Sequence, residues 1–530
     1  MIPVVLWLIS IVLLLAMWFE CRDPHVVVRI PELFRRIARL TGGVIYEDPA
    51  LALRIQLTRM MVIITALTGA IIAVLERDRL RNAVGSLVNR ASDPLNLSVF
   101  RIVVFWQILD ICDFDFISRL ATLPTGLQYP PQTSIPAVSF LRHFALWPVH
   151  TVSPALIGHA GVLMKWATIA ALVGLFSRTS ATVVCILFGF IWSRLQWYGK
   201  VDHYHHLFWF ALLLATSPCG DVLSVDWIIG KVRGKQTPGP GQQYGRPLGF
   251  AMILMGVIYL FPGLWKTCRS GLDWALSDSP KFMMYQEWRL YGDWLPWFRY
   301  DQHPWMYHAG ALGTMLFELS FLFLLLGRRS RYVAAAMGVS FHLMTNFTLN
   351  IGFESLRNCY TVFVDWARII KRRVQIPTPS ASFWQVGRAT AAVGIILVAG
   401  NLWAGGMRAM DGWPLACYPP FDGLTPQYYR TLRMQLTFKD GTTKTIAPDD
   451  YRTLFRNRWS NLLQRILDTR DERDRSARLH LIWQVLATTD PLIANARHVQ
   501  FSSVRTFLDP RRWSEPPDDK RLLYEADIEP

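Results

Sequence analysis

The residues best suited to chemistry lie together between two long apolar runs, in the segment Lys-Val-Asp-His-Tyr-His-His at 200–206. Lys200 is a candidate general base, because a lysine that loses hydration near a membrane releases its proton more readily. His203 and His206 are three residues apart and share one face of a helix, so their imidazoles could polarise a carbonyl or relay protons. Ionisable groups at this depth are costly unless they face a cavity, a partner or a substrate.

Each of these residues also has a simpler interpretation. Lys200 could extend to the lipid headgroups, and Asp202, only two residues away, would favour its charged form. The histidines could be interfacial residues that bond to water or backbone, and His205 points away from the other two. We expect no metal site. The pattern H-x-H-H is similar to one box of the membrane di-iron desaturases, but the other histidines are scattered singly and supply too few ligands.

Further ionisable residues lie within or beside the apolar runs. Glu318 and His342 each fall in the middle of such a run, and we expect either a substrate or cofactor site or a mutual structural pair between packed helices. Lys266, at the outer end of its run, is expected at the membrane interface. Asp221 and Asp226 are expected to cap helices or form turns rather than catalyse.

An aromatic segment at 269–307 contains five tryptophans. Such residues gather at the interface between membrane and water, so we first expect an aromatic belt. The alternative is a hydrophobic entrance for a quinone or an acyl chain. The five are Trp274, Trp288, Trp294, Trp297 and Trp305.

Long apolar runs predict an all-α polytopic membrane protein. The chain has 530 residues, of which 52% are hydrophobic, and a span needs roughly 20 apolar residues. We expect about 9–11 transmembrane helices, and 59–75 and 355–369 are short enough to be re-entrant or interfacial. The candidate spans are 2–19, 59–75, 98–116, 157–177, 179–197, 206–222, 247–265, 308–326, 332–350, 355–369 and 384–404.

The net charge of +16 lies mostly in short segments between these spans. No nucleic-acid-binding pattern occurs, so the lipid bilayer is the expected partner, not nucleic acid. No Cys-x-x-Cys pair occurs, so zinc or thioredoxin-type chemistry has no support. Basic connections face the cytoplasm, among them the flexible linker predicted at 230–245. This rule places the 200–206 segment and the C-terminal tail on the extracytoplasmic side, and it leaves the topology of the first 92 residues open.

The tail after about residue 407 has the composition of a small extracytoplasmic α+β domain. Alternating apolar residues around Asp440-Gly441 predict a hairpin at 434–446. A helical segment is expected at 459–487, with further strands at 499–508 and 522–528. The predicted domains are an N-terminal anchoring region at 1–92, a membrane domain at 93–370, a final transmembrane helix at 371–406 and the C-terminal domain at 407–530.

Several segments, in order along the chain, resemble the HTTM (horizontally transferred transmembrane) domain family, which includes the vitamin K-dependent γ-glutamyl carboxylases. Together they cover about 95–370, more than half of the chain. The segments are Asp93-Pro94 to Phe100-Arg101, Gly174 to Arg178, Lys200 to Leu207, Ser217-Pro-Cys-Gly-Asp221 with Asp226, Tyr259 to Lys266 with Trp274, Phe317-Glu318, and His342 with Phe353.

The resemblance implies a mechanism. In the carboxylases a membrane lysine deprotonates reduced vitamin K, and oxygenation then yields a base that removes a γ-proton from a peptide glutamate before CO₂ adds. Lys200 matches that lysine. The interval from Lys200 to His203 is shorter here than in the carboxylases, so the substrate stays open.

We therefore expect a quinol-dependent carboxylase, a lyase, with Lys200, His203 and His206 as catalytic residues and Asp202, Glu318 and His342 at the substrate or cofactor site. Reduced vitamin K or another quinol would be the cofactor, and a peptide on the extracytoplasmic side the substrate. Two alternatives belong to other classes: a non-enzymatic membrane scaffold for peptide processing or export, and a proton-coupled transporter. The absence of a visible inverted repeat speaks against the transporter.

Overall fold

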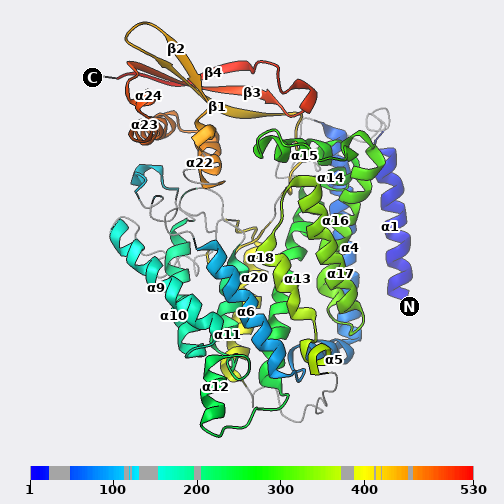
Figure 1. Cartoon of the computed structure of the whole chain (residues 1–530). Coiled ribbons are helices and arrows are strands. Elements are labelled where there is room, and N and C mark those ends of the chain that lie inside the picture. Colours follow the sequence, from blue (N-terminus) through cyan, green and yellow to red (C-terminus); the bar gives the residue numbers. More distant parts are fainter. Residues whose placement is uncertain are drawn as a thin grey trace. The chain divides into compact units, whose positions relative to one another are not determined.

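The computed structural model describes eleven stretches of the chain, and Lys200, Asp202 and His203 lie outside them. The described residues are 2–22, 48–112, 119, 122–129, 153–195, 198, 204–371, 387–410, 413–418, 421–451 and 457–528. They form two compact units (Figure 1). Unit 1 comprises Met1–Asp93, Pro240–Arg408 and Cys417–Pro426, and unit 2 comprises Pro94–Gly239, Ala409–Ala416 and Gln427–Pro530.

The prediction of an α-helical membrane protein is confirmed. Seven helices in the described stretches are long and apolar enough to cross a membrane, and α10 (Ser177–Leu195), α11 (His205–Ala215) and α17 (Ser330–Leu349) lie in further predicted spans. The seven are α1 (Ile2–Glu20), α4 (Pro49–Leu75), α6 (Pro94–Ile111), α9 (Pro154–Val173), α13 (Gln242–Ser270), α16 (Pro304–Leu324) and α20 (Arg388–Gly406).

Three predicted spans were wrong in extent. The run at 59–75, expected to be short, belongs to the 27-residue helix α4, which is long enough to cross a membrane. The span at 206–222 ends as a helix at Ala215, because Pro218 lies in the turn that follows and cannot supply an amide donor. The segment at 355–369 is not one helix. It divides into α18 (Glu354–Asn358), the 3₁₀ turn η4 (Cys359–Phe363) and α19 (Trp366–Lys371), with Val364 in an extended conformation.

In unit 1 the central element is α13, which contacts α4, α5 (Arg77–Val88), α16 and α20. Glycines allow these close contacts. A side chain at Gly249 would meet the Leu87 carbonyl of α5 at 2.4 Å, and one at Gly256 would meet Leu322 of α16 at 2.6 Å. Every turn of α13 therefore has a neighbour, which explains why polar groups on this helix become buried.

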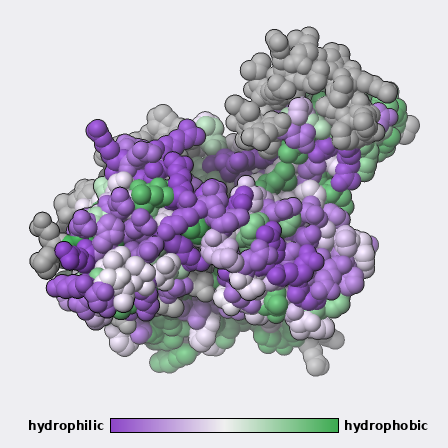
Figure 2. All heavy atoms as spheres, turned by 90° about the horizontal axis from the view of Figure 1, so that it is seen from above, coloured by the Kyte–Doolittle hydropathy of each residue, from purple (hydrophilic) through white to green (hydrophobic). Residues whose placement is uncertain are grey.

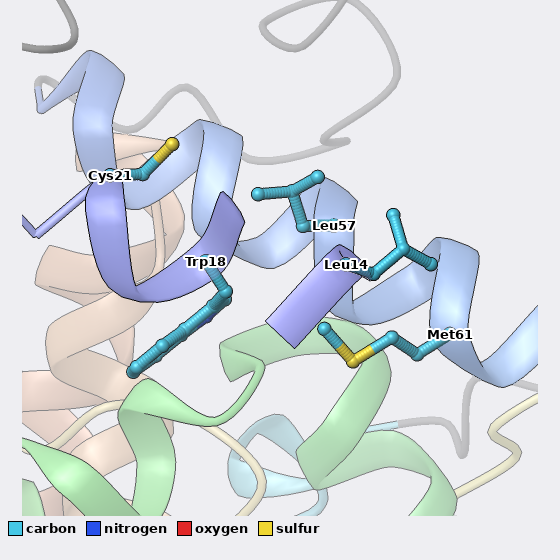
Figure 3. Close-up of a cluster of buried hydrophobic side chains, with 5 residues drawn as sticks. All are labelled: Leu14, Trp18, Cys21, Leu57 and Met61. Carbon is cyan, nitrogen blue, oxygen red and sulfur yellow. The ribbon is translucent and has the colours of Figure 1, made fainter. Parts of the chain in front are cut away.

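The helices α1 and α4 pack along each other through a small apolar cluster (Figure 3). Leu14, Trp18 and Cys21 of the first segment meet Leu57 and Met61 of α4. Residues on the outer side of the pair, such as Leu13 at 60% and Leu67 at 60%, stay exposed. An apolar side chain that no protein covers is what a lipid-facing helix surface requires.

In unit 2 the helices α6, α9, α10 and α11 pack together, and the C-terminal residues form an antiparallel sheet in the order β2-β1-β3-β4. The predicted hairpin is confirmed: β1 (Tyr428–Thr437) pairs with β2 (Thr443–Ile446), and Thr437 faces Thr443. The predicted strands at 499–508 and 522–528 appear as β3 (His498–Phe507) and β4 (Asp518–Asp527).

The predicted helical segment at 459–487 forms α22 (Asn457–Asp468) and α23 (Glu472–Thr489). The break between them occurs where Asp471 caps α23 by accepting the amide protons of Arg473 and Asp474. Figure 2, which is turned to view the molecule of Figure 1 from above, shows a mostly hydrophilic surface with smaller hydrophobic areas. Its position on the extracytoplasmic side stays a prediction.

Candidate functional site

A buried ion pair joins α13 to α16. Lys266 Nζ lies 2.5 Å from Glu318 Oε1, and each side chain is only 4% exposed. We expected Lys266 at the membrane interface, but the structure buries it. The reason is Gly263, one turn earlier, where a Cβ atom would lie 2.8 Å from the Cβ atom of Glu318. The two helices can approach because that position has no side chain.

The ion pair is only partly satisfied. The ring of Trp274 lies 4.8 Å from Lys266 Nζ, a cation–π contact that adds to the attraction of the carboxylate. The second carboxylate oxygen, Glu318 Oε2, is buried and has no hydrogen-bond partner among the described residues. A buried acceptor without a donor costs free energy, so a proton or a further donor at this oxygen would be stabilising.

A second polar group surrounds Tyr259, also on α13. The Tyr259 hydroxyl lies 2.6 Å from His342 Nε2 of α17, and the Tyr360 hydroxyl of η4 donates to the Tyr259 hydroxyl at 2.9 Å. Gly338 leaves room for this contact, because a Cβ atom there would lie 1.9 Å from the Tyr360 hydroxyl. All three side chains are buried, and Phe317, Phe321 and Phe363 pack around the two tyrosines.

The expected pairing of Glu318 with His342 does not form. Each residue instead meets a side chain of α13: Lys266 pairs with Glu318, and Tyr259 pairs with His342. Tyr259 and Lys266 are seven residues apart, two helical turns, and therefore lie on one face of α13. That spacing is visible in the sequence and could have identified both partners. No comparable spacing in the sequence points to Tyr360. We refer to these five residues as the polar set.

The histidine segment is described only from Tyr204 onward. His205 and His206 open α11 and are both buried, at 0% and 1% exposure. The His205 ring lies 4.6 Å from the ring of Trp413, and the His206 ring 5.8 Å from that of Phe210. Trp209 donates its indole proton to the Pro414 carbonyl at 2.7 Å. Aromatic rings thus enclose both imidazoles. Of the predicted catalytic residues, only His206 is described.

Three of the quoted motifs meet at a structural junction in unit 2. Arg101 is fully buried and donates to the carbonyls of Cys219 and Leu223, at 2.9 and 2.5 Å. Asp226 accepts the amide protons of Phe176 and Ser177, at 2.8 and 2.7 Å. The prediction that Asp226 forms a turn contact is confirmed. These motifs hold the ends of α6, α9, α10 and α11 together.

Close approaches reinforce this junction of Arg101, Asp226 and the turns at 174–177 and 217–224. Gly174 has a φ of +71°, and a Cβ atom there would lie 2.7 Å from Arg101 Nη1. A Cβ atom at Gly220 would lie 2.0 Å from Ser177 Oγ. Both positions therefore require glycine for packing, and the first also for its left-handed backbone.

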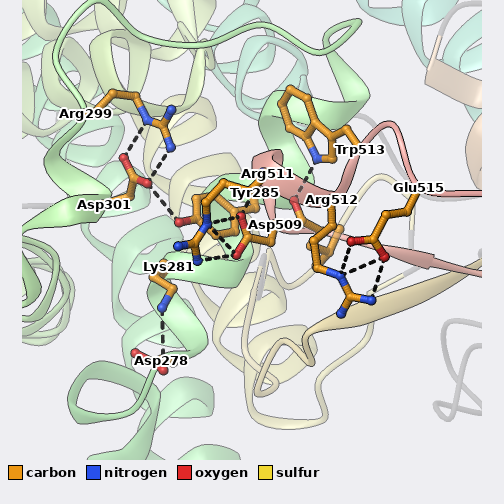
Figure 4. A network of polar contacts seen from close by, with 11 residues as sticks. Asp278, Lys281, Tyr285, Arg299, Asp301, Asp509, Arg511, Arg512, Trp513 and Glu515 are labelled. Carbon is orange, nitrogen blue, oxygen red and sulfur yellow. Dashed lines mark hydrogen bonds and ion pairs between the residues drawn. The ribbon is translucent and has the colours of Figure 1, made fainter.

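The aromatic segment divides into buried and exposed residues. Trp274 and Trp288 are buried, whereas Trp297 and Trp305 are 83% and 70% exposed. A belt at the interface can therefore involve only the exposed ones. The loop before α16 is held by Asp301, which accepts hydrogen bonds from Arg299 and from Tyr285 (Figure 4). Burial works to raise the pKa of Asp301, but the hydrogen bonds and charge of Arg299, with the Tyr285 bond, outweigh it and lower the pKa.

No group of three or more potential metal ligands occurs among the residues that the structure describes. The polar set, together with His205 and His206 of α11, is a candidate for proton transfer and hydrogen bonding. Histidine, tyrosine and a carboxylate–lysine pair can all exchange protons.

Comparison with known proteins identifies the family. The family model for the HTTM domain matches residues 89–366, which is more than half of the chain and includes Lys200, both described histidines and the whole polar set. No curated protein and no solved structure matches the chain. The chain belongs to the HTTM domain family.

Proposed function

We propose that this membrane protein is a carboxylase-like lyase that uses a reduced quinone and acts on glutamyl residues of a peptide, with Lys200 as the base. The observation that carries the proposal is the polar set, a buried group of proton-exchanging side chains inside the family-matched segment. Ionisable residues are rare within membrane helices and mark sites of function. A passive scaffold would have no need to keep them.

The described part of the histidine segment supports the proposal with groups that could bind a hydroquinone. Imidazole nitrogens can accept the phenolic protons, and His205 and His206 are surrounded by the rings of Trp209, Phe210 and Trp413. When bound, a reduced quinone that reacts with O₂ would supply the strong base needed at the glutamate γ-carbon. In this proposal Lys200 takes the phenolic proton, and His203 and His206, with Asp202 nearby, orient the ring and pass the proton on.

In this proposal Glu318 and His342 serve a second task, the movement of protons within unit 1. Glu318 can take a proton from Lys266 on its bonded oxygen, while its other oxygen remains available. The hydroxyls of Tyr360 and Tyr259 lead to His342, which can accept a proton through Nε2. In this proposal the polar set therefore stores and transfers protons within unit 1.

The direct test is reduced-quinone-dependent incorporation of ¹⁴CO₂ into glutamyl peptides by the purified protein. Lys200→Ala should abolish incorporation while the protein still inserts and folds. The matched control is Lys439→Ala, which removes an exposed lysine of the α+β module and should leave incorporation unchanged. If the wild-type protein incorporates no ¹⁴CO₂ with any reduced quinone, the carboxylase proposal fails.

One observation favours proton-coupled transport as a second candidate. A buried carboxylate with one oxygen unbonded, as at Glu318, is also what a proton carrier would need. Reconstitution in vesicles separates the two: substrate uptake that depends on a pH gradient and is lost in Glu318→Gln would support transport. If neither uptake nor carboxylation is observed, the non-enzymatic membrane scaffold remains as the interpretation.

A further inference from the structure

The short helix α12 (Val225–Val232) is fixed at the ends of three membrane helices of unit 2 (Figure 1). It follows the turn after α11 and begins at Ser224, whose hydroxyl accepts the amide proton of Trp227 at 2.8 Å. The Asp226 amide donates to the Gly174 carbonyl at 3.0 Å, and its carboxylate accepts protons from the turn between α9 and α10. The orientation of α12 is therefore set by the junction.

The outer side of α12 is apolar and uncovered. Ile228, Ile229 and Val232 are 55%, 39% and 85% exposed. Val232 lies three residues after Ile229 and four after Ile228, so the three side chains share one side of the helix. The Asp226 carboxylate instead accepts the amide protons of Phe176 and Ser177 in the junction. In the adjoining turn between α9 and α10, Phe176 is 71% exposed. Exposed apolar side chains grouped in this way mark a contact surface.

Three basic residues surround the end of this helix. Lys231, Arg233 and Lys235 are exposed, and none forms an ion pair with any residue that the structure describes. The chain turns back at Gly234, with a φ of +76°, and the Lys235 amide donates to the Gly230 carbonyl at 2.9 Å. Trp227 also donates to Thr237 Oγ1 at 3.3 Å. This part of the linker, predicted to be flexible, is thus hydrogen-bonded to α12.

We propose that α12 and the turn after it form an interfacial anchor that binds anionic phospholipids. Ile228, Ile229 and Val232 enter the boundary between headgroups and acyl chains, and Lys231, Arg233 and Lys235 contact the lipid phosphates. A helix with an apolar side and flanking lysines or arginines lies in this plane of a bilayer. The position at the ends of α9, α10 and α11 brings it there. This inference does not depend on the proposed enzymatic function.

Native mass spectrometry of the full-length protein tests the anchor. The protein, purified in detergent, is offered phosphatidylglycerol and phosphatidylcholine in competition, and the retained lipids are counted. Wild-type protein should retain phosphatidylglycerol preferentially. The variant Lys231→Gln/Arg233→Gln/Lys235→Gln should lose this preference by on the order of a hundredfold, because each basic residue near an anionic surface strengthens the attraction severalfold.

The control Lys439→Gln/Lys444→Gln/Arg473→Gln removes the same charge from exposed residues of the α+β module. It should keep the wild-type preference. If it loses the preference equally, or if the α12 variant keeps it, the anchor is refuted. An unchanged thermal midpoint in phosphatidylcholine shows that the α12 variant is folded. Should it not fold, the three single substitutions replace it, and each should lower the preference severalfold.

Two further measurements separate the contributions that the acyl chains and the headgroup of the lipid make to binding. Ile228→Ser/Val232→Ser keeps every charge but removes the apolar side, so retention of phosphatidylglycerol should also fall. An excess of glycerol 3-phosphate should not displace the lipid from the wild-type protein. Complete displacement would mean that the basic residues recognise a small free phosphate, and the proposed membrane anchor would then be wrong.

Discussion

Apart from Tyr360, the polar set of unit 1 consists of residues from the motifs quoted for the family, as does the junction of unit 2. The two regions differ in how their polar atoms are satisfied. At the junction, Arg101 and Asp226 bind backbone carbonyls and amides at the ends of helices. In the polar set, side chains bind side chains, and Glu318 Oε2 and His342 Nδ1 keep no hydrogen-bond partner among the described residues.

This difference separates structure from chemistry. At the junction the side chains bond to backbone amides and carbonyls, which hold them in position and join the helix ends, so they stabilise the fold. A side chain bonded to another titratable side chain can exchange protons with it. Motif residues of one family thus divide into those that assemble the helices and those that remain available for function.

Removal of Glu318 should have the largest effect. Glu318→Ala leaves Lys266 buried without its counter-charge, so we expect a loss of roughly 3–5 kcal/mol in stability. The double variant Lys266→Met/Glu318→Leu should recover most of that stability, since it buries no charge, but it should not recover activity. Thermal unfolding in detergent measures the stability, and the ¹⁴CO₂ assay measures the activity. Recovery of both would make the ion pair purely structural.

Removal of Arg101 is the corresponding change at the junction. Arg101→Met leaves the carbonyls of Cys219 and Leu223 without that donor, and we expect a cost of about 2–4 kcal/mol. Activity per folded molecule should stay unchanged. The check is the ratio of activity to folded protein, measured below the unfolding temperature. A selective loss of activity at an unchanged midpoint would contradict the distinction between the two regions.

A matched pair of glycine substitutions compares the two regions directly. Gly263→Ala introduces a methyl group against Glu318, and Gly220→Ala introduces one against Ser177. Each should destabilise by about 1–3 kcal/mol through overpacking. Only Gly263→Ala should also lower activity, because it moves α16 and so separates Glu318 from Lys266. Equal activity in the two variants would argue against a role for the ion pair.

A pH titration gives the smallest effect and serves as a reference outside both regions. Because Arg299 and Tyr285 hold the pKa of Asp301 below its ordinary value, the ionised form stabilises the folded state. This contribution is present above the ordinary aspartate pKa, about 3.9, and is lost as the pH falls further. Asp301→Asn should flatten the pH dependence of the unfolding midpoint below about pH 5, where the aspartate begins to bind a proton in the unfolded state. If the midpoint of the variant depends on pH as steeply as that of the wild type, Asp301 contributes nothing to the pH dependence of stability.

Apolar length and turn chemistry in the sequence were sufficient to locate most elements. The runs around α1, α6, α13 and α20 are simply too long and too apolar for any other structure. Alternation around Asp440-Gly441 was enough to place the β1–β2 hairpin. The prediction failed at 206–222, where hydropathy continues past Ala215 but the chain turns, because Pro218 cannot continue a helix.

The residues that are costly to bury can be identified without a structure, because Lys266, Glu318 and His342 each lie beside or within an apolar run. Their partners are known only from the packing of the helices. Pairing depends on which helix packs against which, and that follows from side-chain shape, such as the gap at Gly263, rather than from polarity. Hydropathy along the chain describes how deep a residue lies, whereas the partner comes from a helix far away in sequence.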